Sequence, residues 1–176
     1  RLAVQHAERY SLDRIGFDDE TLLRFQQPLG REHGLIYLTG PTGSGKTTTM
    51  YAALLHPREL PGGKAHLVPL EAPMEMDFEA RAPTEVTPDL GLTFATGLRS
   101  ILRQDPDIIL VGEIRDEVTA ETATRAANTG HLLLTSVHAD SSVGVFLRLQ
   151  QLRVDTHQAA SASIAVVNQR LAIRNC

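Results

Sequence analysis

The sequence predicts an α/β fold in which an open, mostly parallel sheet is flanked by helices. The short run at residues 108–111 is uniformly apolar, which is typical of a strand covered on both faces in a parallel sheet, and residues 132–137 predict another buried strand. Stretches with helical patterns separate the apolar runs, so strands and helices alternate along the chain. A glycine-rich stretch at 40–45 directly follows the first core strand and leads into a helix. These three observations predict an open α/β sheet whose site lies at the carboxyl ends of the strands.

The first elements follow from local patterns. Asp18 suits the N-cap of a helix that continues through Phe25, and Pro28 is expected to end or kink that helix. The next expected elements are a strand at 35–39, a helix at 45–55, a turn-rich loop at 57–63 and a strand at 66–70.

The second half of the chain repeats the alternation. Residues 71–88, rich in acids and proline, predict irregular structure or a short antiparallel excursion. Residues 92–104 predict an amphipathic helix, because Phe94, Leu98 and Ile101 fall on one face. The remaining expected elements are a strand at 108–111, a helix at 116–128 closed by Gly130, a strand at 132–137, and helices at 141–152 and 156–173.

The glycine-rich stretch has the pattern G-x-x-x-x-G-K-T, which is typical of a phosphate-binding loop between a strand and a helix. Its residues are Gly40, Pro41, Thr42, Gly43, Ser44, Gly45, Lys46 and Thr47. The glycines permit backbone angles that turn successive N–H groups toward an anion. Lys46 brings a positive charge to the β and γ phosphates, and Thr47 offers a hydroxyl to Mg²⁺. The motif therefore predicts a nucleoside-triphosphate site, at which the helix N-terminus also favours negative charge.

Glu113 is the candidate for activating water, because hydrolysis needs a group that orients the attacking molecule. It follows the buried run 108–111 and Gly112, which places a carboxylate at the carboxyl edge of the sheet. The functional interpretation is a general base or water-positioning group. The alternative is a glutamate that merely leaves the core for solvent. Many such ATPases carry an aspartate just before this glutamate; Gly112 stands there, so magnesium would depend on Thr47, phosphate oxygens and water.

His131 and His138 lie at the two ends of the apolar run 132–137. A strand of this length separates them by roughly 23 Å, so they cannot bind one metal ion together. Either histidine alone can donate a hydrogen bond to a phosphate, and His138, at the carboxyl end, is the better placed. The alternative for each is a strand-end histidine with a backbone partner.

Composition limits the classes of function. The 176 residues suit one well-buried domain with room for a small appendage, and 42% apolar with 22% charged residues is ordinary for a globular protein. The net charge of −4 argues against a nucleic-acid-binding surface. The single cysteine excludes an internal disulfide and fits a reducing compartment. Because the chain begins at Arg1, we expect it to be a piece of a longer protein.

Four ordered motifs resemble those of the secretion ATPase superfamily of type II secretion and type IV pilus assembly. They are residues 39–49, residues 98–107, residues 111–116, and residues 129–131 together with 137–138. The similarity runs from about residue 12 to the last residue. It implies a P-loop NTPase with a RecA-like sheet that hydrolyses ATP with Mg²⁺.

The resemblance also assigns roles to residues. It makes the first motif Walker A, extended to Thr48, and makes Glu113 the catalytic glutamate. Residues 129–138 match the family's histidine box, which implies that His131 binds nucleotide and that His138 acts in catalysis. Residues 71–75 resemble the aspartate box, usually E-D-P-x-E, and imply a supporting role for Glu71 and Glu75. Ala72 replaces the central aspartate of that box, which puts full activity in question.

The resemblance implies a domain organisation. Residues 1–33 are expected to lead in from a linker to a preceding N-terminal domain, and residues 34–176 to form the ATPase domain. Assembly-type members often carry a four-cysteine zinc element, and Cys176 stands where its first cysteine would be. One thiol cannot make a structural zinc site, so no zinc is expected in this chain.

Finally, the resemblance implies partners and location. Family members act as cytoplasmic homo-hexamers on the inner face of the bacterial inner membrane, docked on a platform protein, and direct nucleic-acid binding is not expected. Ring ATPases commonly use a neighbour's arginine in the transition state. Arg115 and Arg103 are candidates here, whereas Arg99 and Arg125 fit solvated surface positions. The alternatives to an assembly or type II secretion motor are a weakly hydrolysing structural or regulatory ring component and a pilus retraction ATPase. A GTPase is disfavoured because no N-K-x-D segment is present.

Overall fold

The computed structural model describes residues 10–56, 65–73, 84–87 and 91–173. Six strands form one sheet, in the order β3-β2-β4-β5-β1-β6, and each neighbouring pair is parallel. The strands are β1 (Gly34–Thr39), β2 (Leu67–Glu71), β3 (Thr84–Glu85), β4 (Ile108–Val111), β5 (Leu132–Ser136) and β6 (Ser163–Asn168). The helices are α1 (Asp19–Leu29), α2 (Lys46–Leu54), α3 (Phe94–Ile101), α4 (Glu117–Asn128), α5 (Ser142–Gln151) and α6 (Thr156–Ala162). The described residues also contain two short 3-10 turns, η2 (Leu12–Arg14) and η4 (Leu102–Gln104).

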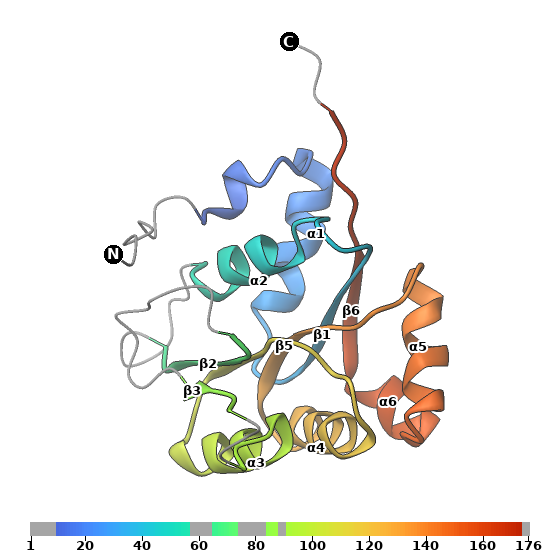
Figure 1. Cartoon of the computed structure of the whole chain (residues 1–176). Coiled ribbons are helices and arrows are strands. Elements are labelled where there is room, and N and C mark those ends of the chain that lie inside the picture. Colours follow the sequence, from blue (N-terminus) through green and yellow to red (C-terminus); the bar gives the residue numbers. More distant parts are fainter. Residues whose placement is uncertain (1–9, 57–64, 74–83, 88–90, 174–176) are drawn as a thin grey trace.

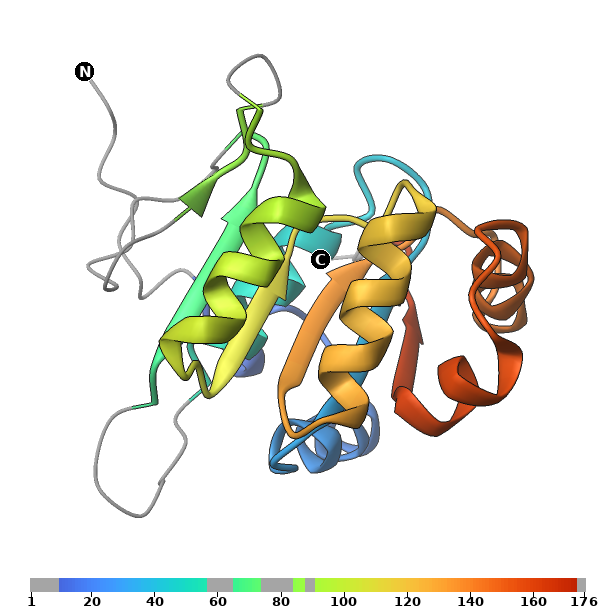
Figure 2. The same cartoon turned by 90° about the horizontal axis from the view of Figure 1, so that it is seen from below.

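Helices cover both faces of the sheet (Figure 1). Helices α1 and α2 lie on one face, and α3 and α4 lie on the other, where Figure 2 shows them in front of the strands. Helices α5 and α6 lie beside β6. This arrangement explains why β1, β4 and β5 are buried at every position.

Alternate residues of each central strand enter two separate cores. In β1, Leu35 and Tyr37 belong to the core under α3 and α4, whereas Ile36 and Leu38 belong to the core under α1 and α2. The same alternation holds in β4 and β5. Each central strand therefore anchors a helical layer on both sides, as the period of two in a strand requires.

The predicted helix at 156–173 is wrong. Helix α6 ends at Ala162, and the chain continues directly into β6, which pairs with β1 in parallel. The β6 sequence contains Ile164, Val166 and Val167, whose branched side chains favour a strand. Pairing with β1 overrides the helical pattern that the neighbouring alanines produce.

Two further expectations concern the acid-rich stretch and the loop before it. Residues 84–85 pair in parallel with β2, not in the antiparallel excursion offered as an alternative. An antiparallel bridge does occur, between Thr87 and Leu92. The loop expected at 57–63 lies outside the described residues.

Among the described residues, no helix combines the length and the hydrophobicity that a membrane span requires.

The N-cap of α1 gives the first testable prediction. The Asp18 carboxylate accepts hydrogen bonds from the Thr21 backbone N–H at 2.8 Å and from the Thr21 hydroxyl at 3.0 Å. The backbone bond chiefly, with the hydroxyl, lowers the pKa of Asp18 below its ordinary value of 3.8. Because the folded state favours the carboxylate, this stabilisation is complete above pH 3.8 and is lost as the pH falls through the lower, folded-state pKa.

We therefore expect Asp18→Ala to lower the urea midpoint of unfolding at neutral pH, with the difference from the parent shrinking in acid. Asp18→Asn is the matched control, because asparagine also caps well and does not titrate. A deficit of Asp18→Ala that is the same at neutral and strongly acidic pH would contradict the role given to the carboxylate.

Candidate functional site

The glycine-rich loop connects the carboxyl end of β1 to the first turn of α2. Gly40, Gly43 and Gly45 have φ angles of 137°, 76° and 84°, in the region that favours glycine. At Gly40 a side chain is also excluded by space, because its Cβ would lie 2.2 Å from the backbone oxygen of Gln169. Gly45 is the N-cap residue of α2, so the N-terminus of that helix opens into the loop. The fold thus gives the loop the geometry that its sequence motif requires.

Lys46 is held inside the curve of this loop. Its Nζ donates hydrogen bonds to the backbone oxygens of Gly40 and Pro41, each at 2.9 Å. Partial burial lowers the pKa of Lys46. Within the described part of the chain, the buried Ser44 hydroxyl has no hydrogen-bond partner. The loop therefore holds a cation and a free hydroxyl beside backbone N–H groups, a set of donors that suits a phosphate.

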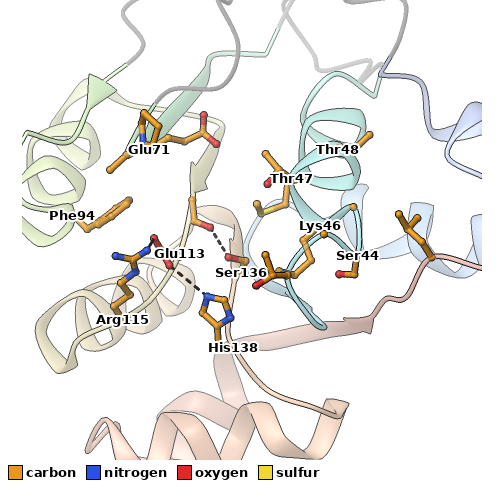
Figure 3. Close-up of a pocket in the computed structure, with 18 residues that line it drawn as sticks. Ser44, Lys46, Thr47, Thr48, Glu71, Phe94, Glu113, Arg115, Ser136 and His138 are labelled. Atoms are coloured by element: carbon orange, nitrogen blue, oxygen red, sulfur yellow. Dashed lines mark hydrogen bonds and ion pairs between the residues drawn. The ribbon is translucent and has the colours of Figure 1, made fainter.

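A cavity of about 700 Å³ lies in front of the loop. Figure 3 shows side chains from both sides of the sheet edge pointing into it. The loop and the start of α2 contribute Thr42, Gly43, Ser44, Gly45, Lys46, Thr47, Thr48 and Met50. The opposite wall contains Glu71, Ala72, Pro73, Phe94, Gly112, Glu113 and Arg115, while Ser136, His138 and Leu171 complete the lining. Of the predicted loop residues, Gly40 and Pro41 form the base that holds Lys46 and do not line the cavity.

Glu113 faces the loop across this cavity (Figure 3). Strand β5 lies between β1 and β4, so Glu113 is one strand removed from the loop. Its carboxylate lies 2.5 Å from the guanidinium of Arg115 and 3.8 Å from Nε2 of His138. The Glu113 side chain is only 14% exposed, whereas those of Arg115 and His138 are 69% and 61% exposed. The carboxylate is therefore mostly withdrawn from solvent, and its charge is balanced by a neighbouring cation.

His138 is fixed by hydrogen bonds on both sides of it. The N–H of Val137 donates to the backbone oxygen of Leu38 at 3.0 Å. The Thr39 hydroxyl donates to the backbone oxygen of Ala139 at 2.5 Å and lies 3.1 Å from the Ala139 N–H, which donates to it. The turn that carries His138 is thus tied to the end of β1, immediately before the phosphate loop.

Glu71 ends β2 on the far wall of the cavity. It is 4% exposed, and it accepts a hydrogen bond from the hydroxyl of Tyr51 on α2. This bond links the acid to the helix that follows the phosphate loop. Ala72 also lines the cavity and brings no carboxylate to it, while Glu75 lies outside the described residues.

His131, predicted to bind nucleotide, is not brought to this cavity. It precedes β5, and its backbone oxygen accepts a hydrogen bond from the N–H of Gly34, the first residue of β1, at 3.0 Å. Both strands begin there, so His131 lies at the amino edge of the sheet, opposite the loop. His131 is therefore not among the residues that line this cavity, from which strand β5 separates it, and its role in binding nucleotide stays a prediction.

The four candidate arginines differ in whether they line the cavity. Arg115 lines the cavity. Arg125 pairs with Glu121 one turn away on α4, with both side chains more than half exposed. Arg99 and Arg103 are exposed residues of α3 and η4. Of these candidates, the structure brings Arg115 to Glu113.

Sequence reasoning missed Ser136, Phe94 and Tyr51. The Ser136 hydroxyl donates to the backbone oxygen of Gly112 at 2.7 Å, which ties β5 to the turn before Glu113. A polar residue at the carboxyl end of an apolar strand was the available signal for Ser136. Phe94 and Tyr51 looked like ordinary core residues of helices, and no local pattern distinguished them.

The oxygen atoms around the cavity suit Mg²⁺, which prefers hard oxygen ligands and keeps several waters when it binds a nucleotide. Thr47 and Glu113 line the cavity from opposite sides. Within the described residues, no cluster of three or more His, Cys, Asp or Glu side chains is arranged to hold a metal by itself. The donor set therefore fits a magnesium ion that arrives with phosphate oxygens.

The sequence matches known proteins over its whole length. The family model for type II/IV secretion system proteins matches residues 1–176. The chain is 40% identical over 176 residues to the type II secretion system ATPase E of Vibrio cholerae, covering 100% of this chain and 34% of that relative. It is 41% identical to the type IV pilus assembly ATPase PilB of Myxococcus xanthus, covering 100% and 31%. The chain thus spans about a third of the length of these curated relatives.

Solved structures share the fold. The crystal structure of the pilus retraction motor PilT with bound ADP matches with a TM-score of 0.75 and 32% identity, over 91% of this chain and 48% of that one. The VirB11 ATPase of the Brucella suis type IV secretion system, in complex with sulphate, matches with a TM-score of 0.65 and 30% identity, over 85% and 46%. The predicted fold class, a P-loop NTPase with a RecA-like, mostly parallel sheet, is confirmed.

Proposed function

The chain belongs to the type II/IV secretion system protein family, and on that premise we propose that it binds Mg²⁺-ATP and hydrolyses it. One observation carries the proposal: the phosphate loop and Glu113 line the same cavity from opposite sides. Binding of nucleotide requires the phosphate loop. Hydrolysis also requires a group that orients water, and Glu113 is proposed to be that group.

Each cavity residue has a role that its position supports. The N–H groups of residues 43–47 cradle the β phosphate, and Lys46 exchanges its bonds to the loop oxygens for bonds to phosphate. Thr48, which lines the cavity from the first turn of α2, would add a hydroxyl to the nucleotide site. Glu113 orients the attacking water and accepts its proton, while Arg115 fixes the orientation of that carboxylate. Thr47, together with phosphate oxygens, would hold Mg²⁺, which would neutralise part of the phosphate charge.

His138 and Glu71 support this chemistry. His138 lies 3.8 Å from Glu113, on a turn tied to β1, so it is placed to contact the γ phosphate and to transmit its loss. Glu71, held by Tyr51, orders water or the metal shell on the far wall. Glu75 is proposed to assist from the same acidic segment.

The chain spans about a third of the length of its curated relatives. The whole protein is proposed to power pilus assembly or type II secretion. In this proposal residues 34–176 form the ATPase domain, and residues 1–33, of which α1 packs on the sheet of that domain, lead in from a linker to a preceding domain. It works as a homo-hexamer on the cytoplasmic face of the inner membrane, docked on a platform protein. A retraction motor is the alternative within the same family, since PilT shares the fold.

The Lys46→Ala variant tests binding. Charge-assisted hydrogen bonds contribute about 1.5–3 kcal/mol, so we expect affinity for a fluorescent ADP analogue with Mg²⁺ to fall at least tenfold. Hydrolysis, measured over a range of protein concentrations because a ring is expected, should fall with it. Arg24→Ala, which removes an exposed charge on α1, is the control. Unchanged affinity in the folded Lys46→Ala variant would refute the phosphate site.

The Glu113→Gln variant tests the chemistry. Loss of a general base costs about 10²- to 10⁴-fold in rate, so we expect turnover to fall by that range while nucleotide affinity stays within a few fold. Glu121→Gln is the matched control, because Glu121 is an exposed residue of α4 paired with Arg125. Hydrolysis that persists in Glu113→Gln would refute the assignment of Glu113 as the general base.

A second candidate function is a nucleotide-binding ring component that hydrolyses ATP weakly. Ala72 supports it, because this cavity residue contributes no carboxylate where the family pattern has an aspartate. If this function is correct, the parent will bind nucleotide with little turnover, and Ala72→Asp will raise turnover several-fold without changing affinity. Ala160→Asp, on the exposed face of α6, controls for added charge. Efficient ATP turnover by the parent that Ala72→Asp does not change would refute the weakly hydrolysing function and support the motor function.

A further inference from the structure

The segment that follows β6 runs alongside the phosphate loop (Figure 1). The N–H of Gln169 donates to the backbone oxygen of Thr39 at 2.8 Å, so the pairing of β6 with β1 continues to the last residue before the loop. Two residues later, Leu171 lines the cavity. Gln169 is therefore placed against the loop by main-chain pairing that does not depend on its side chain.

Gln169 contacts the loop at both of its ends. Its backbone oxygen occupies the space beside Gly40, where a Cβ would approach it to 2.2 Å. Its side-chain Nε2 occupies the space beside Gly45, where a Cβ would approach it to 2.9 Å. The first and last glycines of the motif thus both pack against one residue, about 120 positions further along the chain.

The side chain of Gln169 is held in place by α2. The hydroxyl of Thr49 donates to Oε1 of Gln169 at 2.8 Å. Thr49 is fully buried, and its own N–H donates to the backbone oxygen of Gly45 at 3.0 Å. Gln169, Thr49 and Gly45 therefore form a closed set of contacts at the point where the loop becomes a helix.

We infer that Gln169 is a positioning residue for the phosphate loop: it holds the loop and the first turn of α2 in the shape that receives phosphate. Gln169 does not line the cavity, so it acts through Gly40, Gly45 and Thr49 and not by contact with nucleotide. The inference rests on the proposed function, because it concerns the same nucleotide site.

The physical consequence is preorganisation. A loop that is already held in its binding shape costs little to order when phosphate enters, whereas a released loop must be ordered at the expense of affinity. The chemical step is assigned to Glu113, which follows β4, and does not need Gln169. Loss of the side-chain contact should therefore weaken binding and raise KM, while kcat at saturating ATP changes little.

The test measures the affinity of the chain for a fluorescent ADP analogue with Mg²⁺ in matched variants. One hydrogen bond contributes about 1 kcal/mol, so we expect Gln169→Leu and Thr49→Val each to bind about five- to tenfold more weakly. Because both remove the same bond, the double variant should bind no more weakly than either single variant. Thr49→Ser, which keeps the hydroxyl, should retain the parent's affinity. Gln150→Leu, the same change at an exposed site on α5, should also leave affinity unchanged.

The melting temperature without nucleotide separates positioning from general stability. A merely structural role would lower the melting temperature of Gln169→Leu and Thr49→Val and leave the affinity of the folded fraction at the parent's value, which would overturn the inference. Additive losses in the double variant would also overturn it. If the parent itself binds no nucleotide, the proposed function fails and the inference fails with it, whereas equal affinities of parent and variants refute only the role of Gln169.

Discussion

The parallel pairing of β5 with both β1 and β4 is the constraint on which the site depends. In this register Leu38 is level with Ser136, and Thr135 is level with Val111. Because all three strands end at one edge, the phosphate loop, Ser136 and Glu113 meet although they lie far apart in the sequence. A shift of one residue in either pairing would turn apolar side chains toward the wrong core and would displace Glu113 from the loop.

Thr39 joins the three segments at this edge. Its backbone oxygen accepts from Gln169, and its hydroxyl is bonded to both the N–H and the oxygen of Ala139, beside His138. The next residue begins the phosphate loop. A shift of the loop would therefore move the turn that carries His138, because direct hydrogen bonds connect Thr39 to that turn. The ion pair of Glu113 with Arg115, in the segment that follows β4, is linked to the same edge through the bond from Ser136 to Gly112.

Local patterns were enough to predict the parts of the structure that local physics decides. Short apolar runs marked β1, β4 and β5, because strands covered on both faces cannot carry exposed polar residues. The glycine-lysine motif marked the loop, and a carboxylate two residues after a buried strand marked Glu113. Strand β6 was missed because the alanines around it produce a helical pattern, and its branched residues decide for a strand only through pairing with β1. Gln169 was missed because its partners Gly40 and Thr49 are more than 100 residues away. The positions of the two histidines at opposite ends of β5 followed from the length of the apolar run alone.

The division of the interior by the sheet into two cores has a consequence for how this domain tolerates change. Met50 and Leu54 of α2 pack only in the core that supports the loop, whereas Leu98 of α3 and Ala123 of α4 pack only in the other. Substitutions placed on opposite faces share few neighbours, so their effects on folding free energy should add. Packing beneath α3 and α4 can therefore change while the helix that begins at the phosphate loop keeps its own packing. The face under α3 and α4 is bound to the site elsewhere, through Ile114 beside Glu113 and Val137 beside His138, so each face of the sheet supports a different wall of the cavity.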